Sequence, residues 1–223
     1  MMSRIKKYKW ALLVLVLHLA AVLWFATQLP ADAQVPIHWN YQSQIDGWTG
    51  RTAGLVWGLG INVFMFLLLF MFHWYSPWYK RNAERFENIL PPLTTTLLSC
   101  FAALSLYSLY VAKWGEVPGI KLILVLIGFL FVFLGNILPK VPKNTMIGIR
   151  TPWTIANELI WEKTHRLGGW LFVIGGLILI IKGLFLTGSS LLQTITTVLA
   201  FGCLLYPSLH SFILFKKSRN KDS

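Results

Sequence analysis

The stretch that decides how this chain is organised runs from Gly135 to Phe172 and reads GNILPKVPKNTMIGIRTPWTIANELIWEKTHRLGGWLF. It lies between two long apolar runs, yet it is rich in polar and aromatic side chains and is interrupted by prolines and glycines. A simple connecting loop needs none of these residues. We therefore take this central stretch as a candidate functional segment that the rest of the chain presents. Its candidate site residues are Asn136, Lys140, Asn144, Arg150, Thr151, Trp153, Asn157, Glu158, Trp161, Thr164, His165 and Arg166.

Outside the central stretch the chain is dominated by apolar runs. Hydrophobic residues make up 56% of it and charged residues only 13%, whereas a soluble domain is usually about a quarter charged. The runs are apolar on all sides and about 18 to 23 residues long, which is enough to cross a hydrocarbon core of roughly 30 Å. The sequence therefore predicts an all-α membrane protein with six transmembrane helices. They are expected at residues 10–27, 53–74, 93–112, 120–138, 167–186 and 193–215, with a basic loop at residues 75–92 and a tight turn at 188–192.

Positive charges are distributed unequally between the two sides of the predicted bundle. Of the 20 Lys and Arg residues, 16 lie in the two termini or in loops on their side, and four lie on the other side. Cytoplasmic loops of membrane proteins carry such an excess. We therefore predict that both termini are cytoplasmic and that the first loop is extracellular. The same bias accounts for the net charge of +12, so we expect no direct nucleic-acid binding.

The first loop, residues 28–52, is long, polar and aromatic: QLPADAQVPIHWNYQSQIDGWTGRT. Pro30 and Pro36 favour extended backbone before them, and Asp46-Gly47 is a turn signal. These features predict a small structured cap, with tryptophans at the level of the lipid headgroups. The candidate residues of this loop are His38, Trp39, Asn40, Asp46 and Trp48.

Within the central stretch, Thr151-Pro152 is a favourable helix start, with Thr151 as N-cap and Pro152 in the first turn. We expect the helix to continue through Gly168-Gly169 into the fifth span. It would then present an amide, an indole, a hydroxyl and an imidazole on one face: Asn157, Trp161, Thr164 and His165.

The prolines at 139 and 142 and the glycine at 148 indicate a partly re-entrant cytoplasmic loop between helices 4 and 5, since irregular backbone at membrane depth must be buried in protein. Two interpretations of the cluster stay open. It is either a structural anchor that caps helix ends, or a binding surface or polar site near the inner membrane surface.

Metal binding is a weaker alternative. Glu162-x-x-His165 has the spacing of carboxylate-bridged sites in helix bundles, but the sequence lacks the second copy that those sites require. His38 and Asp46 also have ligand chemistry, on the opposite side of the membrane. Cys100 lies inside an apolar run, as does the second cysteine, so no disulfide framework or Cys-based zinc site is indicated.

Enzyme activity is not expected, and neither is a cofactor. The chain has no Walker loop, no G-x-S-x-G and no H-E-x-x-H. Glu158 or Glu162 could act as a base beside His165, but no nucleophile or oxyanion motif accompanies them. The competing class is a small-molecule transporter or membrane enzyme with an intramembrane polar site. Such a site would use His18, Asn62, Asn136 and His210.

Two stretches resemble a known family. The central matches are Gly135-Asn136, Leu138-Pro139-Lys140, Pro142-Lys143-Asn144, Gly148-Ile149-Arg150-Thr151-Pro152-Trp153-Thr154, Asn157-Glu158, Trp161, Lys163-Thr164-His165-Arg166 and Gly168-Gly169. This pattern resembles the defining motif of the SdpI immunity-protein family. Residues 35–40 and 46–48 of the first loop resemble a small domain of unknown function that commonly precedes the motif. One departure is Gln42-Ser43-Gln44, where relatives often have a glycine-containing turn.

The resemblance implies a multi-pass protein of the bacterial plasma membrane with two regions. Residues 1–112 would form the preceding small domain, with helices 1–3 and outer loop 28–52, and residues 113–223 the SdpI-like region, with helices 4–6 and motif 135–172. The best-known member protects its producer against a secreted, membrane-active peptide toxin. With toxin present, it also recruits its own soluble repressor to the membrane. The resemblance thus implies three partners: the lipid bilayer, a peptide toxin at the first loop and a soluble transcriptional repressor at the central stretch.

Overall fold

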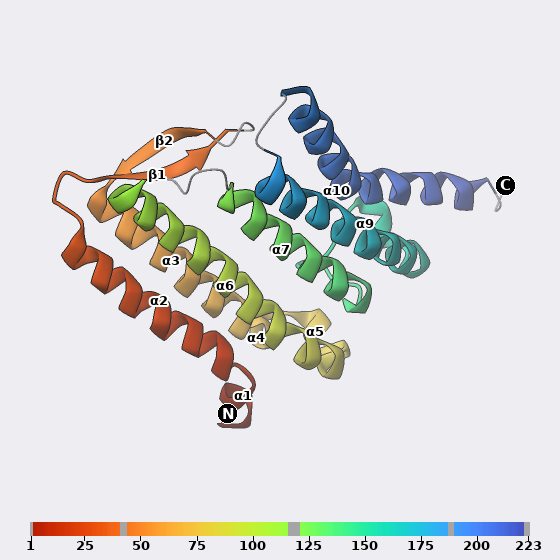
Figure 1. The fold of residues 1–223 in the computed structure, drawn as a ribbon. Helices are drawn as coiled ribbons and strands as arrows, with labels where there is room; N and C mark the ends of the chain where they lie inside the picture. Colours follow the sequence, from red (N-terminus) through yellow and green to blue (C-terminus); the bar gives the residue numbers. More distant parts are fainter. Residues whose placement is uncertain (1, 41–43, 116–120, 187–189, 221–223) are drawn as a thin grey trace.

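Six long helices lie side by side in the structure, a computed structural model that describes residues 2–40, 44–115, 121–186 and 190–220 (Figure 1). All six are long and apolar enough to cross a membrane, which confirms the prediction of six spans. The spans are α2 (Lys9–Gln28), α3 (Arg51–Phe70), α6 (Ala83–Trp114), α7 (Leu122–Ile137), α9 (Glu158–Phe185) and α10 (Ser190–Arg219). The other elements are α1 (Met2–Lys7), β1 (Gln34–Trp39), β2 (Ile45–Gly50), α4 (Phe72–Tyr75), α5 (Pro77–Arg81), the 3-10 turn η1 (Leu138–Lys140) and α8 (Pro152–Ala156).

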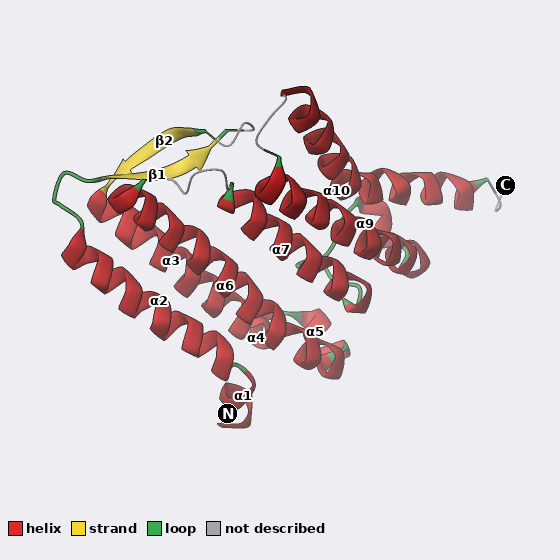
Figure 2. Cartoon of the chain, in the orientation of Figure 1, coloured by secondary structure: helices red, strands yellow, loops and turns green. Residues whose placement is uncertain are grey.

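The bundle has two distinct ends. Strands β1 and β2 form a hairpin that covers one end, which we call the hairpin end (Figure 2). The N-terminus, α4 and α5 lie at the other, which we call the terminal end (Figure 1). The connection from α7 to α9, residues 138–157, also lies at the terminal end, because both helices run between the two ends. The central stretch and the first loop are therefore separated by the length of the bundle.

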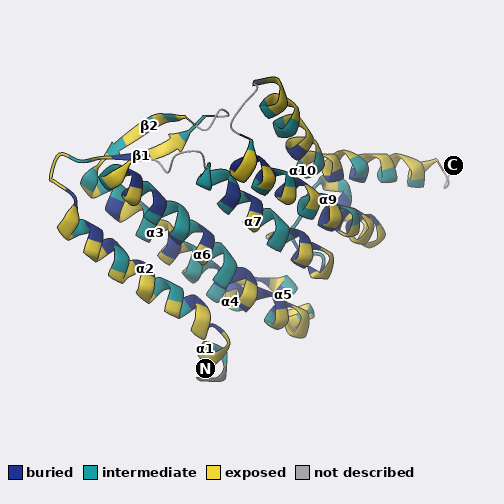
Figure 3. Ribbon diagram, viewed as in Figure 1, coloured by how far each residue is buried: buried dark blue, intermediate teal, exposed yellow. Residues whose placement is uncertain are grey.

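Many large apolar residues on the outside of the helices are exposed. Exposed residues form yellow bands along α2 and α10 in Figure 3. Val16 on α2, Phe64 on α3 and Val198 on α10 are each more than 60% exposed. A soluble protein rarely shows such a continuous apolar surface. In a membrane these side chains meet lipid tails.

The third span is much longer than predicted, because α6 begins at Ala83 and passes through Pro91 and Pro92. The prediction of a loop at residues 75–92 was therefore wrong. An internal proline costs a helix about 3 kcal/mol. Here Phe86 and Leu90 are fully buried, in a cluster with Phe72 and Tyr79, and this packing offsets the cost. The proline pair alone suggests that the helix starts after Pro92, because the sequence does not show that Phe86 and Leu90 are buried.

The first loop forms the predicted structured cap, but its turn lies elsewhere. Strands β1 and β2 are antiparallel, and Gly47 of β2 pairs with His38 of β1. A Cβ on Gly47 would lie 2.9 Å from the Cβ of His38, so a glycine is needed there for close strand approach. The turn predicted at Asp46-Gly47 is thus wrong: the chain reverses between Trp39 and Ile45. Gln42-Ser43 and the turn at 188–189 lie outside the described residues, as does Lys221 of the charge count.

Helices α7 and α9 approach one another at two glycine pairs that we call the glycine seam. A Cβ on Gly128 would lie 2.6 Å from the carbonyl oxygen of Gly176, and a Cβ on Gly135 would lie 2.6 Å from that of Gly169. The pairs are seven residues apart on each helix, nearly two turns, so they lie along one line. Small residues let transmembrane backbones pack this closely. The seam fixes the position of the fifth span against the fourth.

Helix α10 packs on α9 and bends part-way along its length, as Figure 1 shows. Its internal Pro207 is the kind of residue that causes such a bend. Pro207 lies over Gly168 of α9, with 3.4 Å between its Cβ and the position of a glycine Cβ. Beyond the bend, Phe212 and Phe215 pack on the ring of Trp153 in α8, with centroids 5.0 and 5.7 Å away. The last part of α10 therefore lies beside the central stretch.

Candidate functional site

Asn144 holds the loop between η1 and α8 in shape. Its side chain is buried and donates from Nδ2 to the carbonyl oxygens of Pro142 (2.8 Å) and Ile147 (3.0 Å). Its Oδ1 accepts from the backbone N–H groups of Met146 and Ile147, both at 2.7 Å. One amide thus satisfies four backbone groups of an irregular segment, which cannot be left unpaired when buried.

Trp161 and His165 attach this loop to α9. Their rings stack with centroids 3.9 Å apart, and both are buried. The indole N–H of Trp161 donates to the carbonyl of Val141 (3.0 Å), and the backbone N–H of Ile149 donates to His165 Nε2 (3.0 Å). Nε2 is therefore unprotonated, and Nδ1 carries the hydrogen that it donates to Trp161 O (2.8 Å). Both imidazole nitrogens are used in holding the loop.

Gly148 is required where the loop crosses these two rings. Its φ of +117° lies in the region that favours glycine. A Cβ there would overlap His165 Nε2 and lie 3.2 Å from the Trp161 ring. Because neither ring can move away without breaking its hydrogen bond, any side chain at this position disrupts the loop.

The helix predicted to start at Thr151 is broken into two. Thr151 caps α8 as predicted and forms a reciprocal capping box with Thr154, and its hydroxyl also lies 3.0 Å from that of Ser211 in α10. Asn157 then adopts extended backbone (φ −131°, ψ 125°) and caps α9, accepting from the N–H of Ile160. Asn157 therefore does not share the buried face of Trp161 and its neighbours; Asn and Asp side chains readily cap helices in this way.

The candidate residues of the central stretch thus divide into two groups. Five are buried or packed into the fold, and in the described part of the chain Thr164 Oγ1 and Trp153 Nε1 have no hydrogen-bond partner. These five are Asn144, Trp153, Trp161, Thr164 and His165; with Thr151 and Gly148 they form what we call the loop anchor. The exposed group, which we call the basic rim, contains Asn136, Lys140, Arg150, Asn157, Glu158 and Arg166.

Local contacts hold parts of the basic rim. Arg150 donates to the carbonyl of Thr145 (2.8 Å), and Glu158 pairs with Lys143 at 3.3 Å. Asn136 is exposed and donates back to the carbonyl of Val132 in its own helix. Lys140 and Arg166 are also exposed, so the rim is a charged surface near the terminal end.

The described residues contain no group of three His, Cys, Asp or Glu side chains arranged to hold a metal ion. His165 has both ring nitrogens hydrogen-bonded, so the Glu162-x-x-His165 spacing does not provide a free ligand. His38 Nδ1 is hydrogen-bonded to Asp46 Oδ1 on the hairpin. This pairing joins the two strands through exposed side chains.

The other candidate residues of the hairpin differ in exposure: one faces outward and another packs against the bundle. The side chain of Trp48 is 51% exposed. Trp39 turns towards the bundle and stacks on Tyr107 of α6, with 6.0 Å between ring centroids. Asn40 lies at the end of β1, where its Oδ1 accepts from the backbone N–H of Gln44 (3.0 Å). The hairpin is therefore attached to α6 on one face and open on the other.

A groove of about 590 Å³ lies beneath β1, with α3, α6 and α7 around it. Sequence reasoning did not predict this groove. Its one signal is the pair Gly54 and Gly58, four residues apart on α3: a Cβ on Gly54 would lie 2.7 Å from Val35, and a Cβ on Gly58 would overlap Ser105. These glycines let the hairpin and α6 approach α3. The groove is lined by Val35, Pro36, Ile37, His38, Trp39, Thr49, Gly54, Trp57, Gly58, Ile61, Phe101, Leu104, Ser105, Ser108, Ile123 and Ile127.

Residues 140–209 match the SdpI/YfhL protein family. The chain is also 25% identical over 174 residues to Immunity protein SdpI of Bacillus subtilis (strain 168), across 76% of this chain and 82% of that protein. No solved structure matches it. The resemblance predicted from the motif residues is confirmed.

The SdpI relationship and the six spanning helices make this chain a multi-pass cell-membrane protein. The SdpI-family region begins at the last residue of η1 and ends just after Pro207 in α10. It therefore contains the loop anchor, all of α9 and the α10 bend. Every residue that lines the groove comes before it.

The proposed intramembrane polar site is not assembled. His18 of α2 and Asn62 of α3 are buried and lie 2.9 Å apart, and Asn62 also donates to Leu98 O of α6. Asn136 is hydrogen-bonded within its own helix. His210 lies on α10, which packs on α8 and α9. The first two residues are a contact between spans, and the other two lie apart from it.

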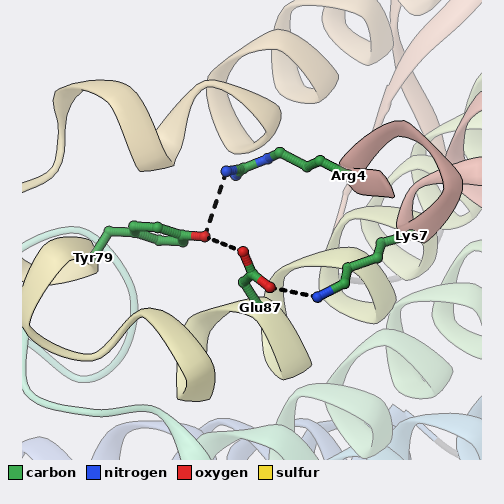
Figure 4. A network of polar contacts seen from close by, with 4 residues as sticks. All are labelled: Arg4, Lys7, Tyr79 and Glu87. Carbon is green, nitrogen blue, oxygen red and sulfur yellow. Dashed lines mark hydrogen bonds and ion pairs between the residues drawn. The ribbon is translucent and has the colours of Figure 1, made fainter. Parts of the chain in front are cut away.

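A second polar cluster lies at the terminal end, outside the SdpI-family region (Figure 4). Glu87 of α6 accepts from Tyr79 of α5 (2.8 Å) and from Lys7 of α1. Arg4 reaches the Tyr79 hydroxyl (3.4 Å) and the carbonyl of Phe70 (3.2 Å). Burial raises the pKa of Tyr79, so its hydroxyl stays protonated and donates to the carboxylate. The cluster attaches the N-terminal helix to α5 and α6.

Proposed function

We propose that this protein protects its cell against a membrane-active peptide that arrives from outside. The observation that carries the proposal is the similarity to Immunity protein SdpI. Its 174 aligned residues are more than twice the length of the family region. The similarity therefore extends beyond the family region, into helices that precede the central stretch.

The form of the hairpin end supports this function. It offers an exposed indole at Trp48 and an apolar groove beneath β1. A tryptophan supplies a large apolar area and one hydrogen-bond donor, which suits contact with an amphipathic peptide at headgroup level. The hairpin end would meet such a peptide before it disturbs the bilayer.

The proposal requires the hairpin end to face outward, as the distribution of Lys and Arg predicts. Single cysteines at Asp46 and Met146, both exposed, test this in a background with Cys100 and Cys203 replaced by alanine. A membrane-impermeant maleimide added to intact cells should label Asp46→Cys and should label Met146→Cys only after lysis. Labelling of both positions in intact cells would contradict the orientation.

Survival tests the function itself. The chain is expressed in a sensitive host, which is then challenged with a panel of secreted membrane-active peptides, and Trp48→Ala is tested in parallel. We expect survival against at least one peptide and reduced survival for the variant at equal membrane abundance. Unchanged killing across the panel, with the wild-type protein present in the membrane, would refute protection.

We further propose that the basic rim recruits a soluble repressor when peptide is bound. The rim supports this role because it places two exposed guanidinium groups, Arg150 and Arg166, at the terminal end, and arginine is enriched in protein interfaces. A tagged repressor from the same genome should be recovered with membranes when peptide is added. Replacing both arginines by alanine should reduce recovery and leave survival unchanged. Recovery that is independent of peptide and of both arginines would refute this role.

A further inference from the structure

The groove beneath β1 is open towards the membrane and has room for a ligand. Helix α6 contributes Phe101, Leu104, Ser105 and Ser108, while residues of α3 and α7 flank it and β1 covers one end. Its volume of about 590 Å³ lies within the range of ligand pockets. Three of its lining residues are well exposed, namely Ile37 (60%), Trp57 (69%) and Ile61 (43%). An occupant can therefore enter from the side.

The depth of the groove determines what can fill it. Its α3 lining runs from Gly54 to Ile61, and its α6 lining from Phe101 to Ser108. Each contains eight residues, and the seven steps between its ends rise about 10 Å along the helix axis. The groove thus extends from the hairpin, which lies beyond the spans, down into their apolar part. An occupant must be apolar along this length and polar where it reaches the hairpin.

The charges near the hairpin end of the groove determine which polar group of a ligand can bind there. The first loop, residues 28–52, contains two carboxylates, Asp32 and Asp46, and one cation, Arg51, whose guanidinium donates to the carbonyl of Ala26, in a chain whose net charge is +12. Asp46 is 45% exposed and is joined to His38, which lines the groove. A cationic group would find its partner here, whereas the terminal end would repel it.

We propose that the groove beneath β1 binds a cationic amphipathic peptide, with apolar side chains between α3, α6 and α7 and a basic group at Asp46. This inference rests on the proposed function and names its site and the chemistry of its ligand. The choice of a peptide over an anionic lipid follows from the carboxylate of Asp46 beside His38 of the groove, because it would repel the phosphate of such a lipid.

Photocrosslinking in the full-length protein tests the site. Benzoylphenylalanine is placed at Ile61 and Ile127 inside the groove, and at Val56 and Phe129 as controls. The controls lie on the same two helices, outside the groove lining, and are 63% and 60% exposed. The protein is reconstituted in nanodiscs of phosphatidylethanolamine and phosphatidylglycerol. The probe is a biotin-tagged synthetic helix of leucine and lysine, with a matched helix of leucine and glutamate as the anionic control.

We expect peptide adducts at Ile61 and Ile127, few at Val56 and Phe129, and weak labelling by the anionic helix. Asp46→Asn should weaken binding of the cationic probe about two- to fivefold, as expected for one exposed ion pair, without changing thermal unfolding. Adducts with lipid alone, equal adducts at all four positions, or equal labelling by the two helices would overturn the proposal. If groove adducts form while cells are not protected, the site assignment stands and the proposed function fails.

Discussion

The loop anchor and the hairpin use the same kinds of side chain in opposite ways. In the loop anchor, the amide of Asn144, the indole of Trp161 and the imidazole of His165 are buried and bonded to nearby backbone. On the hairpin, Asp46 and Trp48 are exposed at the surface. The first set fixes an irregular segment against α9, while the second is available to a ligand.

This difference separates the family-matching segment from the proposed ligand surface, which lies in another part of the chain. The SdpI-family region contains the loop anchor, and every groove-lining residue lies before it. A match to the family region therefore identifies the scaffold. The ligand that a given protein accepts would be decided by residues of the hairpin, α3, α6 and α7.

The largest effect is expected at the glycine seam, which supports the loop anchor. In Gly176→Leu, the new Cβ would lie 2.6 Å from the backbone oxygen of Gly128, and overpacking of this kind costs about 3 kcal/mol. We expect little folded protein in the membrane, measured by fluorescence size-exclusion of detergent extracts. Gly202→Leu on α10 is the control, because nothing lies within 4 Å of its Cβ. Equal yields of the two variants would mean that the seam is loose.

The next effect is expected within the loop anchor. His165→Ala leaves the N–H of Ile149 without its acceptor, and an unsatisfied buried donor costs about 1–3 kcal/mol. Arg150→Ala, the control, removes an exposed side chain and should change the free energy of unfolding by less than about 0.5 kcal/mol. Thermal unfolding in detergent compares them. If Arg150→Ala were as damaging as His165→Ala, the division into loop anchor and basic rim would fail.

A smaller effect is expected in the N-terminal cluster. Tyr79→Phe removes the hydroxyl that donates to Glu87 and should lower stability by about 1 kcal/mol, since Lys7 still pairs with the carboxylate. Tyr110→Phe is the control, because that residue is exposed on α6. Thermal unfolding at neutral pH measures both. Identical midpoints would show that the Tyr79 bond adds nothing to the attachment of α1.

The smallest effect on folding is expected on the open face of the hairpin. Trp48→Ala should leave the free energy of unfolding within about 0.5 kcal/mol of wild type, whereas Trp39→Ala loses its stacking on Tyr107, worth about 1 kcal/mol. Both should reduce protection in the survival assay. Full protection by the Trp48 variant would remove the open face from the proposed ligand surface.

Much of the fold could be predicted because a bilayer imposes simple requirements. Runs of apolar residues of sufficient length predicted six spans, and Thr151 was predicted correctly as a helix cap. The start of α6 was missed, because the burial of Phe86 and Leu90 depends on residues distant in sequence. The break at Asn157 was missed for a related reason: helix periodicity alone does not show that an asparagine side chain will cap the next turn.

The candidate site was less predictable than the fold. Sequence reasoning selected the right residues of the central stretch but left open whether they bind a partner or hold the loop. The geometry of Asn144 and His165 assigns their polar atoms to the loop. The groove was missed because its walls come from five elements, β1, β2, α3, α6 and α7, and only the close approaches at Gly54 and Gly58 marked it.

The glycine seam also sets an order of events during synthesis. Helix α7 has the highest mean hydropathy of the six spans, 2.6, and can enter the bilayer as soon as it leaves the ribosome. Until α9 follows, its glycine face meets lipid instead of Gly169 and Gly176. Residues 138–157, which are made between the two helices, then lack Trp161 and His165, the side chains that hold the loop. We therefore expect residues 141–151 to be cut by protease in chains truncated after residue 157 and released into the membrane, and to be protected in the full-length protein. Protection in the truncated chains would mean that the loop orders itself before its partner helix exists.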